Sequence, residues 1–287
     1  MNIVPQLVAN SLIAASLYTL IAASFNFVYT TTKFFNFAHG AVAAIGGYTV
    51  YYLTESFGLG STLAVLLGVI IAGFIGFCLE KFVYQPLRRR HATRRVLLIA
   101  SLGVLTVLQA ILAILFTNQF QALGTTITGT PFTVFGGIVT RVQVWMLAAA
   151  VCTVVGLTIL LRATTFGRAV RAISDDEEVA KIVGIDTDRI IGRVTFIGSA
   201  IVGLAGILVG FDTGLQPNMG LLLLLSGFVA AVIGGIGSVW GAALGALIVG
   251  VIENFGIWKL SGEWKSAIAF GLLIIFFIFR PQGLVKK

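Results

Sequence analysis

Charged residues are scarce in this sequence. Asp, Glu, Lys and Arg make up 10% of its 287 residues, whereas soluble domains carry roughly 25%. So few charges cannot cover the surface of a water-soluble globule, which argues against a soluble enzyme, and the 58% of hydrophobic residues argue against a disordered chain. The mean hydropathy of +1.02 instead predicts several segments that lie in a lipid bilayer.

Cysteines and phosphate-binding motifs are also few. The two cysteines, Cys78 and Cys152, lie in apolar stretches, so nothing indicates a disulfide framework or a metal site. The sequence contains no G-x-x-x-x-G-K-[ST] loop, and the GIG run at 235–237 lacks the third glycine of a dinucleotide fingerprint because Trp240 stands there. We therefore expect no enzyme activity and no cofactor in this chain.

Apolar runs long enough to cross a bilayer recur along the whole sequence. They predict an all-α, polytopic membrane protein with about eight transmembrane helices in a single domain over residues 1–287. The run at 221–252 is too long for one helix and contains the glycine-rich stretch 234–241, so we expect it to be broken, as a hairpin or as two half-spans. The runs cover residues 6–29, 34–54, 60–82, 96–117, 142–161, 194–214, 221–252 and 264–279.

Basic residues mark one side of these spans. They gather in the loop 85–95, in the stretch 162–193 and in the final residues 280–287. Positively charged loops face the cytoplasm, so the N-terminus is expected outside, the C-terminus inside, and the nearly uncharged loop 118–140 outside. Because the basic loops are short and flank spans, orientation explains them, and we expect no nucleic-acid partner.

The segment 162–193 is the longest predicted cytoplasmic loop and holds six of the eleven acidic residues. We expect a first helix over about 166–173. Ser174 is then predicted to be the N-cap of a second helix, and Glu177, three residues later, completes a capping box.

The second helix of this segment should end near Val183, because Gly184 permits a left-handed cap. Val179, Ile182 and Val183 give it an apolar edge. A metal site at DDEE (175–178) is an alternative, but four consecutive acids point around more than one helix face, and they suit the positive end of the helix dipole. A loop this long with its own helix caps is typical of a docking element.

Four blocks of the sequence resemble one transporter family. Glu178-Val179-Ala180, followed after three residues by Gly184, resembles the EAA loop of ATP-binding-cassette importer permeases. The whole string TTFGRAVRAISDDEEVAKIVGID is similar to the branched-chain amino acid permease family (H-type) within that group. So are NFAHG at 36–40, GGIGSVWGAALGALIVGVIE at 234–253 and RPQGL at 280–284, in the same order along nearly the whole chain.

The resemblance implies a permease subunit rather than an enzyme, one that forms the translocation pathway for branched-chain or related amino acids. It implies a second permease subunit, two cytoplasmic ATPase subunits that bind ATP and Mg²⁺, an extracytoplasmic solute-binding protein and surrounding lipid, in the cytoplasmic (inner) membrane of a bacterium or archaeon. The segment 166–184 would be the coupling helix that contacts an ATPase subunit. The candidate coupling residues are Phe166, Gly167, Arg168, Arg171, Glu178, Ala180, Val183 and Gly184.

Two glycine-interrupted segments, 36–47 and 227–241, are the candidates for the translocation pathway, since such interruptions in the two halves of a transporter mark binding sites. For two of the polar residues a structural interpretation stays open, in which Asn36 caps the second helix and His39 bonds to a neighbouring backbone group. The candidate pathway residues are Asn36, His39, Gly40, Gly46, Gly47, Gly234, Gly235 and Gly237.

Other functions remain as alternatives. A secondary transporter would be expected to carry carboxylates at membrane depth, but the spans are almost bare of acids apart from Glu80 near a span end. Asp212 and Glu253 lie near outer ends of spans, and we expect them to dock a partner or to be solvated. A permease for another small solute, such as urea or an amide, is a further alternative.

Overall fold

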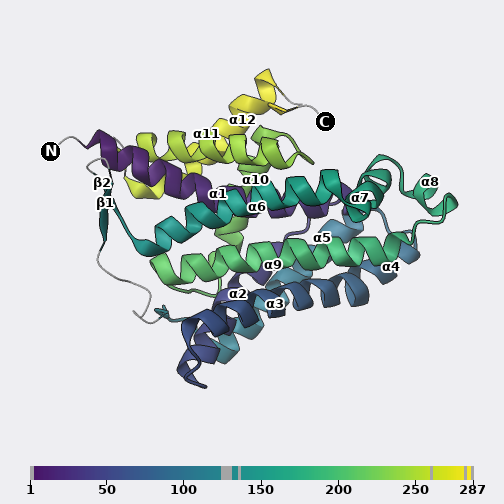
Figure 1. Ribbon diagram of the computed structural model, residues 1–287, viewed down its shortest axis with the longest axis horizontal. Helices are drawn as coiled ribbons and strands as arrows, with labels where there is room; N and C mark the ends of the chain where they lie inside the picture. Colours follow the sequence, from purple (N-terminus) through teal and green to yellow (C-terminus); the bar gives the residue numbers. More distant parts are fainter. Residues whose placement is uncertain (1–2, 124–130, 135–136, 259–260, 281–282, 286–287) are drawn as a thin grey trace. The chain divides into compact units, whose positions relative to one another are not determined.

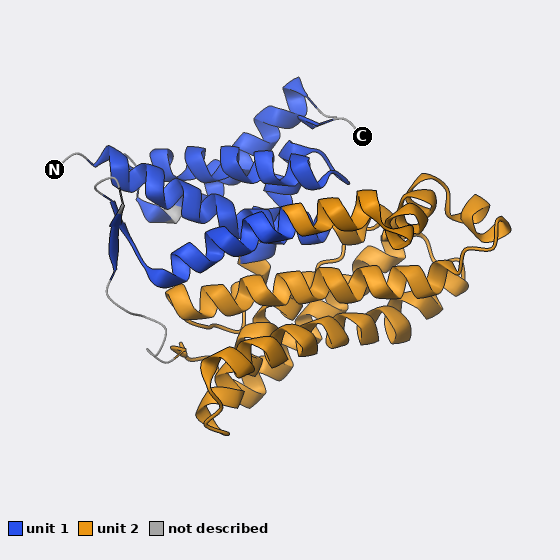
Figure 2. Ribbon diagram, in the orientation of Figure 1, with its two compact units in different colours: residues 1–26, 124–154, 223–287 blue, residues 27–123, 155–222 orange. Residues whose placement is uncertain are grey.

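The computed structural model describes residues 3–123, 131–134, 137–258, 261–280 and 283–285 (Figure 1). The chain divides into two compact units, which are described separately. Unit 1 comprises Met1–Asn26, Gly124–Val154 and Leu223–Lys287, and unit 2 comprises Phe27–Leu123 and Val155–Leu222 (Figure 2). The single transmembrane domain over the whole chain stays a prediction.

Helices make up most of the described chain, which confirms the predicted all-α membrane fold. Within the described ranges, six continuous helical segments are long and apolar enough to cross a membrane, and α10 and α12 are shorter apolar helices. The order is α1 (Val4–Thr32), α2 (Ala38–Glu55), α3 (Ser61–Leu79), a π-helical turn η1 (Glu80–Tyr84), α4 (Gln85–Arg89), α5 (Arg94–Phe116), β1 (Phe132–Val134), β2 (Gly137–Val139), α6 (Arg141–Ala163), α7 (Thr165–Asp175), α8 (Glu177–Ile182), α9 (Thr187–Thr213), α10 (Met219–Gly234), α11 (Val239–Ile257), a 3₁₀ turn η3 (Gly262–Trp264) and α12 (Lys265–Phe279).

The predicted apolar runs agree with these helices within a few residues, with two departures. Helix α9 begins at Thr187 rather than 194, because the Asp186 side chain caps it by accepting a hydrogen bond from the Arg189 amide at 3.0 Å. The loop 118–140 contains an antiparallel pair of strands, β1 and β2, which the sequence analysis did not predict.

The long apolar run at 221–252 is broken, as predicted. It forms two helices, α10 and α11, which make a hairpin. Between them Gly235 and Gly237 have φ values of +114° and +89°, which side chains other than glycine rarely adopt. Ser238 then caps α11, its hydroxyl accepting from the Gly241 amide at 3.0 Å. The glycine-rich stretch is therefore a tight turn between two helices that pack directly on each other.

Unit 2 is built around α2, which packs against both α3 and α9. Helices α2 and α9 approach each other backbone to backbone: a methyl group on Gly46 would lie 2.6 Å from the carbonyl oxygen and 2.8 Å from the Cα atom of Gly203. Small residues let membrane helices pack this closely, and dispersion forces between them then stabilise the pair.

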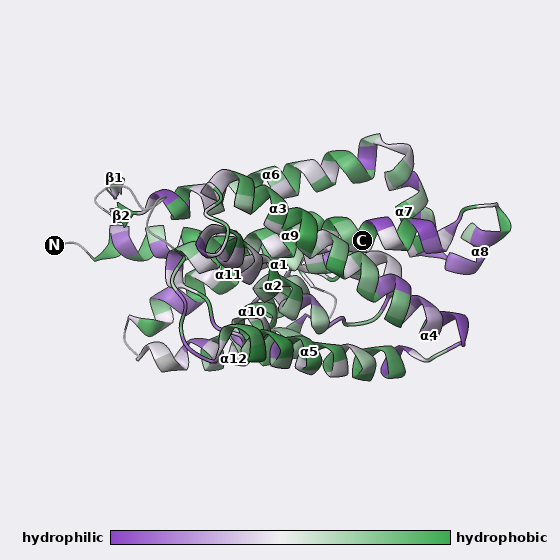
Figure 3. Ribbon diagram, turned by 90° about the horizontal axis from the view of Figure 1, so that it is seen from below, coloured by the Kyte–Doolittle hydropathy of each residue, from purple (hydrophilic) through white to green (hydrophobic). Residues whose placement is uncertain are grey.

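Polar residues of unit 2 concentrate at one end. Figure 3 shows hydrophobic residues along α3, α5 and α9, whereas hydrophilic residues gather at α4, α7 and α8. These three short helices are the parts of unit 2 that leave the apolar spans, so they form its polar cap.

Replacing Gly46 by Ala should lower the thermal stability of the detergent-purified protein. The added methyl group overlaps the Gly203 backbone, and overpacking of this kind costs about 1–3 kcal/mol. The matched control is Gly103→Ala in α5, where a methyl group meets nothing within 4 Å. If both variants unfold at the wild-type temperature, the close approach of α2 to α9 is wrong.

Candidate functional site

The linker that joins α1 to α2 holds the first group of predicted pathway residues. Asn36 is buried, and its Oδ1 atom accepts a hydrogen bond from the Tyr84 hydroxyl at 2.9 Å. Phe34 packs on the Tyr84 ring with 5.1 Å between ring centres. Phe37 is the N-cap residue of α2, so the interpretation of Asn36 as the cap is wrong: its side chain instead ties the linker to the π-helical turn.

The beginning of α2 is closely packed within unit 2. His39 is 2% exposed, and a methyl group on Gly220 of α10 would overlap the carbonyl group of Gly40. About two turns further along, Gly47 lies against the Gly206 carbonyl and the Met219 side chain. The structure therefore places these predicted residues at helix contacts, and their role in translocation stays a prediction.

The second group of predicted pathway residues forms the turn of unit 1. Asn26 of α1 is fully buried, and its side-chain amide donates to the carbonyl oxygens of Gly235 at 3.1 Å and Ser238 at 2.9 Å. Gly234 packs on Gly241, the residue opposite it in α11. Asn26 thus holds both ends of the turn and positions the three predicted glycines, Gly234, Gly235 and Gly237.

Residues near the C-terminus hold the same turn. The Leu284 amide donates to the Ile233 carbonyl at 3.0 Å, and the Val285 amide donates to the Gly234 carbonyl at 3.1 Å. These two carbonyls lie in the last turn of α10, where no helical amide is available to them. The RPQGL block therefore ends in a backbone clamp on the glycine turn.

A buried carboxylate stands at the other end of α11. Glu253 is 1% exposed and accepts a hydrogen bond from the Tyr18 hydroxyl at 2.5 Å, with the Lys265 ammonium at 3.8 Å. The expectation that Glu253 is solvated or free to dock a partner is wrong, because α1 and α12 cover it. Asp212, near the end of α9, is partly exposed.

The predicted coupling segment begins where α7 follows directly on α6. The Thr164 hydroxyl caps α7 by accepting from the Gly167 amide at 2.9 Å. A methyl group on Gly167 would overlap the carbonyl oxygens of Leu160 and Leu161, so only glycine allows this sharp turn. Arg171 donates a hydrogen bond to the Leu161 carbonyl, which fixes α7 to the end of α6 a second time.

Helix α8 starts differently from the sequence-based prediction. Ser174 is buried inside the last turn of α7, so the capping box with Glu177 is wrong. Asp176 has the extended backbone that frees a residue to cap, and its carboxylate accepts from the amides of Glu178 at 2.8 Å and Val179 at 3.1 Å. The predicted end is confirmed: Val183 is the C-cap and Gly184 has φ +87°.

Helix α8 has one buried and one exposed apolar face. Ala180 is 2% exposed and packs on Ile173 of α7 and Ile191 of α9. Val183, in contrast, is 68% exposed, and so are Ile182 and Val179 over more than half of their surface. We call these three residues, Val179, Ile182 and Val183, the exposed apolar edge. Of the other predicted coupling residues, Phe166 is half-buried, and Arg168, Arg171, Glu178 and Gly184 are exposed.

A basic loop lies beside this segment in unit 2. Arg89 pairs with Asp188 at the start of α9 at 2.9 Å, and Arg88 pairs with the buried Glu80 at 2.6 Å. A cavity of about 770 Å³ opens between the basic residues 88–94 and the acidic residues 175–178. The polar cap therefore presents charges of both signs next to the exposed apolar edge.

Sequence reasoning missed Asn26, Tyr84 and Asp176 as positioning residues. Asn26 is a polar residue inside an apolar run, and that signal was available. The role of Tyr84 could not be predicted, because its partner Asn36 is 48 positions away in the sequence, with α2 and α3 between them. Asp176 was hard to single out, because Ser174 and Asp175 are also preferred N-cap residues.

Comparisons with known proteins agree with this architecture. A family model described as "Branched-chain amino acid transport system / permease component" matches residues 7–277. The high-affinity branched-chain amino acid transport system permease protein BraD of Pseudomonas aeruginosa is 32% identical over 98% of this chain and 95% of its own length. Its counterpart LivH of Salmonella typhimurium is 33% identical over the same shares.

A solved structure shows a similar fold. PsaBC from Streptococcus pneumoniae, in complex with a Fab, superposes with a TM-score of 0.52 over 95% of this chain and 91% of that chain, at 13% identity. At this identity the likeness concerns the arrangement of helices alone.

Replacing Asn26 by Ala should destabilise the glycine turn. The buried carbonyl of Gly235 and the partly buried carbonyl of Ser238 lose their donor, and an unsatisfied buried polar group costs about 1–3 kcal/mol. Asn26→Asp keeps the shape of the side chain but replaces the donating amide group by an oxygen, and it should be at least as destabilised, which separates the hydrogen bonds from packing. Asn10→Ala, at an exposed position of the same helix, is the control. Thermal unfolding in detergent measures all three, and equal stability of the Asn26 and Asn10 variants contradicts the assignment.

Proposed function

The chain belongs to the family of permease components of branched-chain amino acid transport systems, and we propose that it forms part of the path by which a branched-chain or related amino acid enters the cell. It is an integral membrane transport component and not an enzyme. In the proposed assembly it pairs with a second permease subunit, two cytoplasmic ATPase subunits and an extracytoplasmic solute-binding protein. ATP and Mg²⁺ are bound by the ATPase subunits.

The observation that carries the coupling role is the exposed apolar edge of α8. Three apolar side chains stand exposed on a short helix outside the apolar spans, next to residues of both charges. Exposed apolar residues with a polar rim are typical of protein interaction sites. We infer that an ATPase subunit covers this edge.

The local packing explains how a movement at α8 would reach the membrane spans. Ala180 joins α8 to Ile173 and Ile191, so α8 cannot shift without α7 and the start of α9. Arg171 and Gly167 join α7 to the end of α6. Closure of the ATPase subunits on ATP would therefore displace the cytoplasmic ends of α6 and α9 together, and so change access to the pathway.

The proposed orientation follows from the charges. The polar cap of α4, α7 and α8 lies in the cytoplasm, the N-terminus outside and the C-terminus inside, in the cytoplasmic membrane of a bacterium or archaeon. In this orientation the turn at 235–238 is near the cytoplasmic face and Glu253 is near the outer face.

Reconstitution tests the proposed function directly. Proteoliposomes that contain this chain with its partner subunits should take up labelled leucine only when ATP is inside with the ATPase subunits and the binding protein is outside. Vesicles without ATP, and vesicles with an ATPase subunit that cannot hydrolyse it, are the controls. Uptake that needs neither ATP nor the binding protein would point to a facilitator or a secondary transporter and would overturn the proposal.

Replacing Val183 by Asp should uncouple ATP hydrolysis from transport. A buried charge at an apolar contact costs several kcal/mol unless it is paired, so uptake should fall at least about tenfold. Because Val183 is 68% exposed in this chain, its own folding should be little affected. Val183→Ala is the control and should retain most activity. The measurements are uptake, ATPase rate and subunit co-purification, and unchanged coupling in the Asp variant means that the contact lies elsewhere.

A further inference from the structure

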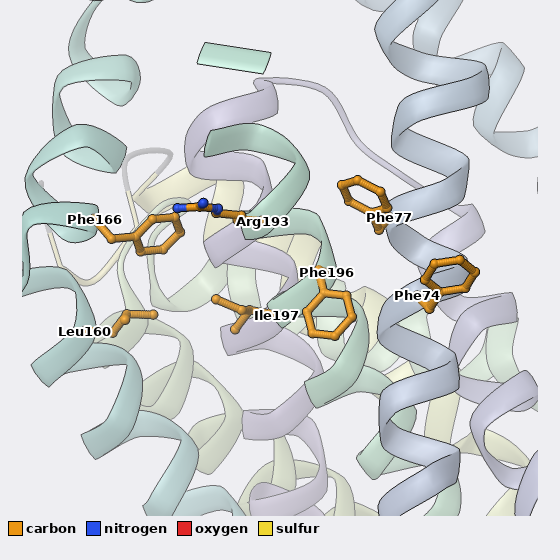
Figure 4. Close-up of a pocket in the computed structure, with 7 residues that line it drawn as sticks. All are labelled: Phe74, Phe77, Leu160, Phe166, Arg193, Phe196 and Ile197. Atoms are coloured by element: carbon orange, nitrogen blue, oxygen red, sulfur yellow. The ribbon is translucent and has the colours of Figure 1, made fainter. Parts of the chain in front are cut away.

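Unit 2 carries an apolar pocket to which the proposed function assigns no ligand. The pocket has a volume of about 500 Å³, within the range of ligand sites, and opens between α3, α6, α7 and α9. Figure 4 shows residues of α3 on one side, those of α6 and α7 on the other, and those of α9 between them. The lining residues are Phe74, Phe77, Leu160, Phe166, Arg193, Phe196 and Ile197.

The aromatic walls of the pocket rest on glycine backbone. A methyl group on Gly73 would lie 3.1 Å from the Phe196 ring, and one on Gly192 would lie 3.0 Å from the Phe77 ring. Each ring thus packs against the backbone of the opposite helix. These contacts fix the positions of Phe77 and Phe196, and so the side of the pocket that α3 and α9 form.

Arg193 is the single charged residue among the residues that line this pocket. Its guanidinium is exposed, and the neighbouring acids are occupied: Asp186 pairs with Arg189 at 3.3 Å, and Asp188 pairs with Arg89 at 2.9 Å. Arg193 forms no ion pair with any residue that the structure describes. A cation therefore stands at the mouth of an apolar pocket with its charge available.

The position of the pocket along α9 matches the depth of a lipid headgroup. Arg193 lies six residues after the start of α9, which is roughly 9 Å along the helix from its cytoplasmic end. Ile197 is one turn further, roughly 6 Å deeper toward the apolar core of the membrane. The charge is thus at the interface and the apolar lining is below it.

We propose that this pocket binds one anionic phospholipid of the cytoplasmic leaflet. The phosphate group accepts hydrogen bonds from Arg193, whose planar guanidinium suits phosphate oxygens, and the upper part of an acyl chain lies among Phe74, Phe196 and Ile197. Anionic lipids are concentrated in that leaflet and attract basic residues near its surface. The site rests on the orientation proposed above and goes beyond the transport function. Because Phe166 of α7 is part of its wall, a bound lipid also braces the start of the coupling segment.

Native mass spectrometry of the detergent-purified transporter complex tests the site. Phosphatidylglycerol is added as the probe, with phosphatidylcholine as the uncharged comparison. Arg193→Gln should bind phosphatidylglycerol about fivefold more weakly, as expected for one basic residue at the interface, while Arg193→Lys retains part of the binding. Arg189→Gln, on the same helix but paired with Asp186, is the control and should bind like the wild type. Equal retention of phosphatidylglycerol by the two glutamine variants overturns the proposal.

A second pair of variants tests the apolar part of the pocket with the charge intact. Ile197→Trp fills the pocket and should reduce bound phosphatidylglycerol, whereas Ile159→Trp, at an exposed position of α6, should not. A cysteine in place of Phe74 that crosslinks to a neighbouring polypeptide would show that protein, not lipid, covers the pocket, and would also overturn the proposal. Lipid retention is measured without transport, so it fails or succeeds independently of the uptake experiment.

Discussion

Backbone groups buried among packed helices have no water to bond to, and this constraint governs two of the described connections between helices, the linker before α2 and the turn after α10. An unpaired buried amide or carbonyl group costs about 1–3 kcal/mol, so each connection needs partners from the chain itself. At the turn after α10 the partners are the Asn26 side chain and the amides of Leu284 and Val285. At the linker before α2, the Ser101 hydroxyl accepts from the Phe37 amide at 3.1 Å. Each of these two connections thus receives hydrogen bonds from residues elsewhere in the chain.

The cost of burying polar groups without partners also explains where glycine and charged residues occur. Glycine appears where two backbones meet, as at Gly46 and Gly203, and the helices need no polar contact there. Charge appears where the chain leaves the bilayer, in α4, α7 and α8, and there it is used for caps and ion pairs. Glu80 and Glu253 are the exceptions: both are buried, and each has a basic partner. The spans are therefore held together mainly by close packing, and the helices of the polar cap by ion pairs and hydrogen bonds.

Hydropathy alone predicted the helices well, because the length of an apolar run is a property of the local sequence. The C-terminal cap at Gly184 was also predicted, because a glycine after the last turn of a helix is likewise a local signal. The start of α8 was not, since Ser174 and Asp176 are both good caps, and the choice between them depends on α7 continuing to Asp175.

The burial of Glu253 could not be predicted either. It depends on Tyr18, which is 235 positions away in the sequence and adjacent only after α1 and α11 have packed. Which residues share a site is in general a tertiary property, and the predicted pathway glycines show this. The sequence singled them out, and the structure places some at helix contacts and others in the turn between α10 and α11.

The backbone clamp on the glycine turn has a consequence for the order of assembly. The carbonyl groups of Ile233 and Gly234 accept hydrogen bonds from residues 284 and 285, which are synthesised some fifty positions later. When α10 and α11 first enter the bilayer, this turn therefore lacks two donors, which are supplied only when Leu284 of the RPQGL block and the following Val285 have been translated. The hydrogen bonds of this hairpin are therefore complete only after residues 284 and 285 have been synthesised and have packed on the end of α10.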